Sequence, residues 1–237
     1  MGSLENRNVV VIGGTSGIGL ATAIAAQTEG ANVWAASRSK DKVTSCAEQF
    51  PDINFSQLDI HDVAELSRLF ESIGAIDHIV AAATGANRTM APFMDQTDDE
   101  FREAFNKFWG YTHVARQGIP HLSETGSVTF VSGTPARKCN PGMSSVSCTG
   151  SAVEGLTRAL ALEVAPVRVN AVAPGLIETG MFEHLKEKPE VLEGMGRSIP
   201  LGRVGQPEEV ASAIILTMTN SYLTGTTIDV DGGVLLP

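Results

Sequence analysis

The sequence has few cysteines, few aromatic residues and no long apolar run. Its three cysteines, Cys46, Cys139 and Cys148, are odd in number and lack CxxC or histidine-rich spacing, which argues against a disulfide framework and a zinc site. No segment approaches about 18 unbroken apolar residues, and the first residues, MGSLENRN, lack the basic and hydrophobic regions of a signal peptide. We therefore expect a cytoplasmic protein in a reducing environment, with no bound metal and no membrane span.

Positive charge is also scarce, because 17 Lys and Arg residues stand against 27 Asp and Glu residues, for a formal net charge of -10. Proteins that bind nucleic acids neutralise phosphates with clustered basic residues. The acidic chain therefore does not suit a nucleic-acid partner. A soluble, enzyme-sized domain that acts on a small-molecule substrate fits the composition best.

Short β-rich runs recur between helical patterns along the whole chain. Apolar strands that alternate with helices imply parallel strands, joined by right-handed crossovers and covered on both faces. The sequence predicts an α/β fold: one domain over residues 1–237, with a Rossmann-like, doubly wound, parallel seven-stranded sheet and helices on both faces. Residues 180–205 break the rhythm, and we expect them to form an excursion on the substrate side. The expected strands are residues 8–12, 31–36, 53–58, 77–83, 127–132, 167–172 and 226–230.

A glycine-rich turn follows the first strand directly, in the run IGGTSGIGLA. In a doubly wound sheet, ligands lie beyond the carboxyl ends of the strands, at the switch in strand order. A strand, a glycine turn and a helix let backbone N–H groups at the helix N-terminus face a pyrophosphate. A turn of this kind also occurs as a purely structural feature, but its position at the start of the chain favours a dinucleotide. The candidate phosphate-binding residues are Gly13, Thr15, Ser16, Gly17, Ile18 and Gly19.

The second strand ends in a small basic cluster that bears on the choice of cofactor. An NAD site usually carries an acidic residue here for the ribose 2′-hydroxyl, whereas NADP requires a cation or a hydroxyl for the 2′-phosphate. Ser37 and Arg38 occupy this position and favour NADP. The alternative interpretation is a solvated basic turn.

These motifs together resemble the short-chain dehydrogenase/reductase family over essentially the whole chain. The family's TGxxxGIG is similar to residues 12–19, IGGTSGIG, in which only the threonine is replaced, and VRVNAVAPGLIET and LTGTTIDVDGG also match family usage. The resemblance implies that Asp59 and Ile60 contact the adenine. It places Ala82 and Ala83 beside the cofactor, where the family has NNAG. It also implies that the nicotinamide is flanked by Pro174, Gly175, Ile177 and Thr179.

The catalytic positions of the family are all occupied by other residues in this chain. The family uses a tyrosine as the proton donor or acceptor, a lysine four residues later that lowers the tyrosine pKa, a serine that polarises the carbonyl, and an asparagine that supports a water relay. An alignment without gaps puts Val146 at the tyrosine, Gly150 at the lysine, Gly133 at the serine and Lys107 at the asparagine. The resemblance therefore implies a divergent member with an atypical active site.

Other polar residues near these positions are candidates for the missing roles. Candidates are Lys107 itself, Ser132 beside Gly133, and Arg137 or Lys138 in the loop after the fifth expected strand. Each could donate a proton or orient an oxygen. For Ser132, a shift of one residue at a strand end turns the side chain to the other face of the sheet. The alternative for the loop cations is a solvent-facing role or a contact with the cofactor phosphates.

Three functions remain open from the sequence. The first is an NADP-dependent reductase that acts on an activated C=N or C=O group of a small, apolar metabolite, since an iminium needs no tyrosine acid. The second is a non-redox isomerase or cyclase, and the third is a cofactor-binding pseudoenzyme. The helix expected over residues 144–164 is rich in Ala, Leu and Val on more than one face, which predicts a homo-oligomer, a tetramer or a dimer.

Overall fold

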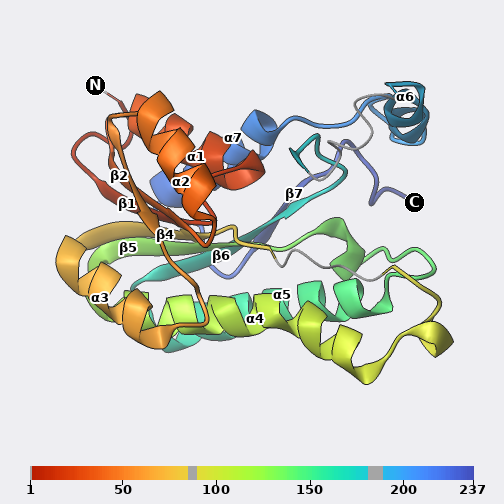
Figure 1. The fold of residues 1–237 in the computed structure, drawn as a ribbon, viewed down its shortest axis with the longest axis horizontal. Helices are drawn as coiled ribbons and strands as arrows, with labels where there is room; N and C mark the ends of the chain where they lie inside the picture. Colours follow the sequence, from red (N-terminus) through yellow and green to blue (C-terminus); the bar gives the residue numbers. More distant parts are fainter. Residues whose placement is uncertain (1, 85–89, 181–188) are drawn as a thin grey trace.

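The computed structural model describes residues 2–84, 90–180 and 189–237 of the chain (Figure 1). Seven parallel strands form one sheet in the order β3-β2-β1-β4-β5-β6-β7, so the order reverses between β1 and β4. This arrangement confirms the doubly wound, Rossmann-like fold and places the switch point beside the glycine turn. The strands are β1 (Asn8–Ile12), β2 (Asn32–Ser37), β3 (Ile53–Gln57), β4 (Ile76–Ala81), β5 (Leu122–Val131), β6 (Arg168–Pro174) and β7 (Thr227–Val230).

Helices cover both faces of the sheet, as Figure 1 shows. One layer contains α1 (Gly17–Thr28), α2 (Lys40–Gln49) and α7 (Pro207–Thr219), and the opposite layer contains α3 (Val63–Ile73), α4 (Asp98–Gly118) and α5 (Ser144–Glu163). The short helix α6 (Pro189–Arg197) stands away from both layers. Single turns of 3-10 helix occur at η1 (Phe93–Asp95), η2 (Ile119–His121) and η3 (Thr134–Ala136).

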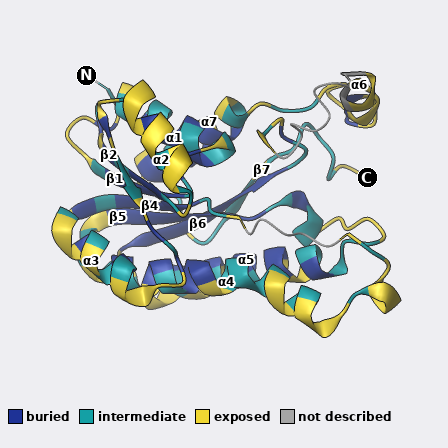
Figure 2. Ribbon diagram, in the orientation of Figure 1, coloured by how far each residue is buried: buried dark blue, intermediate teal, exposed yellow. Residues whose placement is uncertain are grey.

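The strands are buried because successive apolar side chains enter opposite layers. Val10 and Ile12 join the core beneath α3, α4 and α5, whereas Val9 and Val11 join the core beneath α1 and α7. All four are essentially inaccessible to solvent, and Figure 2 shows the buried sheet between helices that are exposed on their outer faces. A strand buried on both faces reads as a continuous apolar run, which is why NVVVI was recognisable in the sequence.

Helix ends follow the capping residues that the sequence offers. Gly30 adopts φ +90° just after α1, as expected for the glycine that ends this helix. Thr97 and Glu100 form a reciprocal capping box at the start of α4, which fixes the helix that carries Lys107.

Only one strand boundary among the described residues differs from the expectation by more than two residues. Strand β5 begins at Leu122, five residues before the expected start, because Leu122 pairs with Ile76 through the backbone although residues 122–126 lack an apolar alternation. The excursion over 180–205 is closed by a bridge between Ile177 and Gly205, and its residues 181–188 lie outside the described residues. Among the residues that the structure describes, no helix is long and apolar enough to cross a membrane.

Candidate active site

The glycine turn after β1 packs directly against the end of β4. The Ala82 amide donates to the Ile12 carbonyl at 2.8 Å, and the Gly13 amide donates to the Ala36 carbonyl at 2.7 Å. Gly13 has φ +89°, and a Cβ there would lie 2.5 Å from the Ala83 backbone nitrogen. Only glycine fits this turn, which brings residues 13, 82 and 83 together at the switch point.

The N-terminus of α1 is built to face an anion. A Cβ at Gly19 would overlap the Gly13 carbonyl oxygen, so the turn and the first helical residues are in close contact. Ser16 is the N-cap residue in extended conformation, yet its side chain makes no capping hydrogen bond, and the first turn has no acidic residue. The first amides of a helix lack intrahelical partners, and the helix dipole favours negative charge there. The arrangement suits a pyrophosphate.

The segment after β6 returns to this turn. At Gly17, with φ +50°, a Cβ would lie 3.1 Å from Thr179 Cγ2, so the phosphate-side turn touches the end of the segment expected to flank the nicotinamide. Gly175 packs against the end of β7, where its amide donates to the Val230 carbonyl at 2.9 Å. Ile177 is buried and pairs with Gly205. The structure therefore brings the two ends of the expected cofactor site into contact.

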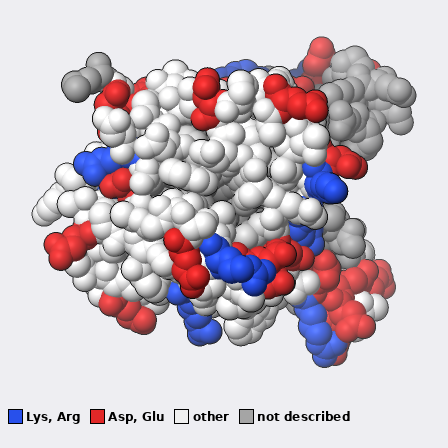
Figure 3. Space-filling model, turned by 60° about the vertical axis from the view of Figure 1, so that its left-hand side comes forward, with Lys and Arg blue, Asp and Glu red and all other residues white. Residues whose placement is uncertain are grey.

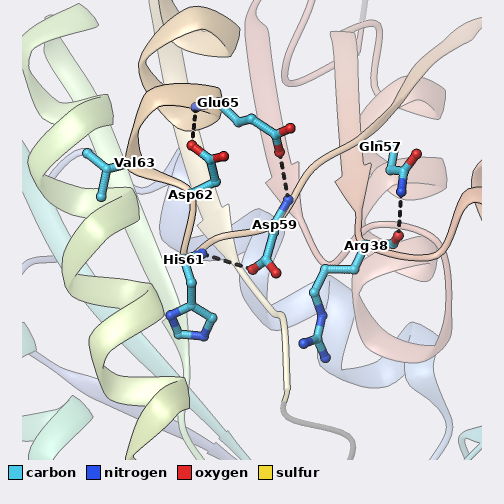
Figure 4. Close-up of a pocket in the computed structure, with 7 residues that line it drawn as sticks. All are labelled: Arg38, Gln57, Asp59, His61, Asp62, Val63 and Glu65. Carbon is cyan, nitrogen blue, oxygen red and sulfur yellow. Dashed lines mark hydrogen bonds between the residues drawn. The ribbon is translucent and has the colours of Figure 1, made fainter.

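A cavity of about 730 Å³ opens at the carboxyl ends of β2 and β3 (Figure 4). Asp59 is held in place because its Oδ1 accepts from the His61 amide at 2.9 Å and its own amide donates to Glu65 Oε2 at 3.2 Å. The Ile60 carbonyl is 3.1 Å from His113 Nδ1. Two residues expected at the adenosine end, Arg38 and Asp59, thus line the cavity. It is lined by Arg38, Gln57, Asp59, His61, Asp62, Val63 and Glu65.

Two positions that the resemblance implies are catalytic lie just after β5 (Gly133) and on α5 (Gly150), and they differ in the space around them. At Gly150, the lysine position of the resemblance, a Cβ would lie 3.0 Å from Ala136 Cβ, so η3 fills the space beside the helix. At Gly133, the serine position, the nearest atom to a Cβ would be Pro135 Cδ at 3.4 Å, which is an ordinary contact. The lysine position is therefore closed and the serine position has room for a side chain.

Ser132 and Lys107 meet at the end of β5. The Ser132 hydroxyl faces α5 and lies 3.3 Å from the Gly150 carbonyl and 3.1 Å from Glu154 Oε1. Lys107 reaches from α4 and donates from Nζ to the Ser132 carbonyl at 3.2 Å, with Nζ also 5.5 Å from the centre of the Tyr111 ring. Two of the three residues predicted to act in catalysis are thus in direct contact. Their catalytic roles stay predictions.

Arg137, the third of these residues, is tied to two carboxylates. It forms a two-pronged ion pair with Asp229 on β7, with Nη1 2.9 Å from Oδ2, and its Nε lies 3.4 Å from Glu154 Oε1. The hydrogen bond to Asp229 raises the pKa of the Arg137 guanidinium, and the charge of Glu154 acts in the same direction. The neighbouring Lys138 donates to the Val234 carbonyl at 2.6 Å and so fastens the C-terminal segment. Glu154 therefore links Arg137 to Ser132.

Sequence analysis missed Glu154 and Asp229. A signal for Glu154 exists, because positions 146, 150 and 154 are spaced by four and share one face of α5. An acidic residue on that face, in a helix otherwise rich in small apolar residues, marks a buried carboxylate. Asp229 has no comparable local signal, since its contact with Arg137 depends on the placement of β7 at the sheet edge.

Comparison with known proteins agrees with this geometry. A family model described as enoyl-(acyl carrier protein) reductase matches residues 13–235. The chain belongs to the short-chain dehydrogenase/reductase family. It is 34% identical over 240 residues to carbonyl reductase family member 4 of Danio rerio, which covers 98% of this chain and 99% of the relative.

Two solved members of the short-chain dehydrogenase/reductase family are similar in structure as well. The MalC reductase/Diels-Alderase of Malbranchea aurantiaca superimposes with a TM-score of 0.89 at 30% identity, over 99% of this chain and 98% of that chain. An NADPH-bound short-chain oxidoreductase of Pseudomonas aeruginosa that contains an atypical catalytic center has a TM-score of 0.90 at 28% identity, over 98% of this chain and 99% of that chain.

Proposed function

We propose that this chain is an NADP(H)-dependent reductase with an atypical active site, which transfers hydride to an activated C=N or C=O group of a small, apolar metabolite. The observation that carries the proposal is the contrast along one sheet edge. The turn at Gly13, Gly17 and Gly19 keeps the close contacts that a dinucleotide site needs, while Val146 and Gly150 supply no proton donor and no cation. The bound cofactor supplies the hydride, and the protein supplies position and charge.

The cofactor assignment rests on the cavity and on the family. Arg38 is the cationic side chain that lines the adenosine-side cavity, next to Ser37 at the end of β2. Its charge suits a 2′-phosphate, and the NADPH-bound relative supports the same choice. We assign cofactor contacts to Gly13, Thr15, Ser16, Gly17, Ile18, Gly19, Ser37, Arg38, Asp59, Ile60, Ala82, Ala83, Pro174, Gly175, Ile177 and Thr179.

The absent tyrosine and lysine restrict the electrophile. Hydride addition to a neutral ketone builds alkoxide charge, and losing one positioned donor for such charge costs about 2.7–4 kcal/mol, or two to three decades in rate. An iminium loses its charge as hydride arrives and requires no acid. Lys107, Ser132 and Arg137 remain the candidate polar residues around the reacting group, and the excursion over 180–205 is proposed to lie on the substrate side.

The test is NADPH consumption with matched panels of simple ketones and cyclic iminium ions, with the products identified by mass. We expect turnover of the iminium ions and negligible turnover of unactivated ketones. Brisk reduction of simple ketones would contradict the proposed substrate class. Tight NADPH binding without hydride transfer to any electrophile would contradict the reductase assignment.

A second candidate is a non-redox cyclase or isomerase that uses the same pocket. The likeness to a reductase/Diels-Alderase supports it, since that relative combines reduction with ring formation by name. Product formation from a reactive diene or other isomerisable substrate without NADPH consumption would favour this candidate. Binding of NADPH with neither reaction would favour a pseudoenzyme.

We also propose that the chain is a cytoplasmic homo-oligomer, a dimer or a tetramer. Trp109 on α4 is 51% exposed and Leu162 on α5 is 84% exposed, which are large apolar side chains on the outer faces of neighbouring helices. The free cysteines suit a reducing compartment. On the face drawn in Figure 3, Lys and Arg side chains are interspersed with Asp and Glu side chains, which suits a small-molecule substrate better than a polyanion.

A further inference from the structure

Glu178 is an acidic residue in a segment that the proposed cofactor site places beside an anion. It stands between Ile177 and Thr179, both of which are proposed cofactor contacts. The first turn of α1, by contrast, has no acidic residue. A carboxylate close to a pyrophosphate repels it unless the carboxylate is held away. In this structure, Glu178 Oε2 accepts a hydrogen bond from Gln206 Nε2 at 2.9 Å.

The backbone fastens Glu178 to the same place, just before α7. Its amide donates to the Gly205 carbonyl at 2.8 Å, and the Gly205 amide donates to the Leu176 carbonyl at 3.0 Å. These two bonds form the bridge between Ile177 and Gly205. A Cβ at Gly205 would lie 2.7 Å from Ile177 Cδ1, so the two segments are in close contact. The side-chain bond from Gln206 therefore reinforces a backbone connection.

Gln206 is itself held in place from α7. Its amide donates to Glu209 Oε2 at 2.7 Å. Arg203 binds the same carboxylate with two nitrogens, Nη1 at 2.9 Å and Nη2 at 2.6 Å. The hydrogen bond from Arg203 lowers the pKa of Glu209 to about 2, so this carboxylate is ionised at neutral pH. Gln206 thus presents its side-chain amide to Glu178 from a backbone that an ion pair keeps in place.

The other end of the segment reaches the start of α1. A Cβ at Gly17 would lie 3.1 Å from Thr179 Cγ2. Helices α1 and α7 pack against each other in one layer of the fold (Figure 1). Residues 176–179 therefore connect the N-terminus of α7 with the N-terminus of α1, where the proposed pyrophosphate site lies.

We propose that Glu178 and Gln206 are positioning residues for the nicotinamide half of the cofactor. The inference rests on the proposed function, because it concerns the binding of NADPH. Gln206 keeps the Glu178 carboxylate on the side of α7, away from the pyrophosphate. The same bond holds residues 176–179 in the conformation that places Ile177 and Thr179 beside the cofactor. Neither Glu178 nor Gln206 needs to touch the cofactor.

Calorimetric titration with two ligands tests this role. NADPH fills the whole site, whereas adenosine 2′,5′-bisphosphate lacks the nicotinamide half. We expect Gln206→Ala to weaken NADPH binding about tenfold, because it removes a hydrogen bond to a charged group and frees the carboxylate, and to leave binding of the bisphosphate within about twofold. Glu178→Ala should weaken NADPH binding only about threefold, since it removes the carboxylate together with its bond.

Two further variants test whether the freed carboxylate is the cause. Glu178→Ala combined with Gln206→Ala should bind NADPH as tightly as Glu178→Ala alone, because no carboxylate remains to be freed. Glu178→Gln should bind NADPH almost as tightly as the unmodified protein, since its amide oxygen still accepts from Gln206 and carries no charge. Both side chains are exposed, so all four variants should unfold at an unchanged temperature.

Glu71→Ala is the matched control. It removes an exposed hydrogen bond of the same length, in which Glu71 Oε1 accepts from Ser67 Oγ at 2.9 Å on α3. Helix α3 lies in the layer opposite α1 and α7. This variant should leave the affinities for both ligands unchanged.

The outcomes distinguish this inference from the proposed function. An equal loss for both ligands in Gln206→Ala, no loss for either, or additive losses in the double variant would overturn the inference, while hydride transfer by the unmodified protein would still support the proposed function. If the expected affinities are measured but no electrophile is reduced, the inference stands and the reductase assignment fails. If the unmodified protein does not bind NADPH, both fail.

Discussion

The two halves of the sheet edge use glycine in opposite ways. In the turn after β1, Gly13 and Gly19 are packed so closely that a Cβ would overlap backbone atoms of Ala83 and of Gly13 itself. Beyond β5, Gly133 has space for a side chain. The first glycines are required by the path of the backbone, whereas no steric demand requires glycine at position 133.

This difference teaches that the two parts of the proposed site are constrained separately: the glycine turn after β1, which is the proposed binding half, and the residues around the end of β5, which are the proposed chemical half. The binding half depends on backbone approach, which leaves no freedom of sequence at its glycines. The chemical half depends on side chains that can be supplied from several elements. Here Lys107 comes from α4, Glu154 from α5 and Arg137 from the segment after η3, and all three converge on Ser132 directly or through a neighbour.

The largest expected effect is on NADPH binding, at Gly19 in the turn after β1. We expect Gly19→Ala to weaken NADPH binding by at least about 100-fold, equal to about 2.7 kcal/mol, because the added Cβ displaces the turn that faces the pyrophosphate. Calorimetric titration measures the loss. Gly155→Ala on α5 is the control, since a Cβ there meets nothing within 4 Å, and it should leave binding unchanged. Equal binding by both variants would contradict the steric account.

A substitution at Arg38 tests whether the proposed binding half prefers NADPH to NADH. We expect Arg38→Asp to weaken NADPH binding about 30-fold, or about 2 kcal/mol, because charge-assisted hydrogen bonds to the 2′-phosphate are lost and a carboxylate repels it. NADH affinity should hold or rise. Titrations with both cofactors measure the preference, and Arg68→Asp, an exposed change on α3, is the control. Equal affinity of the unmodified protein for both cofactors would remove the case for Arg38.

The buried side chain of His78, on β4, should make the free energy of unfolding depend on pH. Burial lowers the pKa of His78 to about 4 from its ordinary 6.5, and its Nδ1 lies 2.9 Å from Ser127 Oγ. Between these pKa values the unfolded chain binds more protons, so stability falls as pH falls from about 6.5 towards 4. The loss at pH 5.5 is about 1.5 kcal/mol.

Denaturant unfolding at a series of pH values measures this loss. His78→Gln should flatten the dependence of the free energy of unfolding on pH in that window. His61→Gln, at an exposed histidine, should retain it. A slope unchanged by His78→Gln would assign the acid sensitivity to other groups.

The smallest expected effect is on thermal stability, at Gly150, where η3 leaves little room for a side chain. Alanine for glycine within a helix usually stabilises by about 1 kcal/mol, and Gly155→Ala should show this gain. Gly150→Ala should show little or none of it, because its Cβ would press on Ala136 at 3.0 Å. Thermal unfolding compares the two. A full gain for Gly150→Ala would show that η3 moves aside easily.

Because η3 crowds position 150, Val146→Tyr with Gly150→Lys should restore ketone reduction only in part.

The sequence alone determined the layout of the fold and the position of the glycine turn between β1 and α1. Continuous apolar runs marked the strands, and the glycine spacing marked the turn, because both signals arise from neighbours in the chain. The early start of β5 escaped it, since Leu122 joins the sheet through backbone pairing with Ile76 of β4 rather than through an apolar pattern.

Only the tertiary structure decided how the chemical half is organised. Ser132 and Glu154 are 22 residues apart, and Arg137 and Asp229 are 92 apart. Their contacts follow from the order of the strands and from the crossover that lays α5 beside β6 and η3. Side-chain partners at such separations are set by where whole elements pack, and no local periodicity records them.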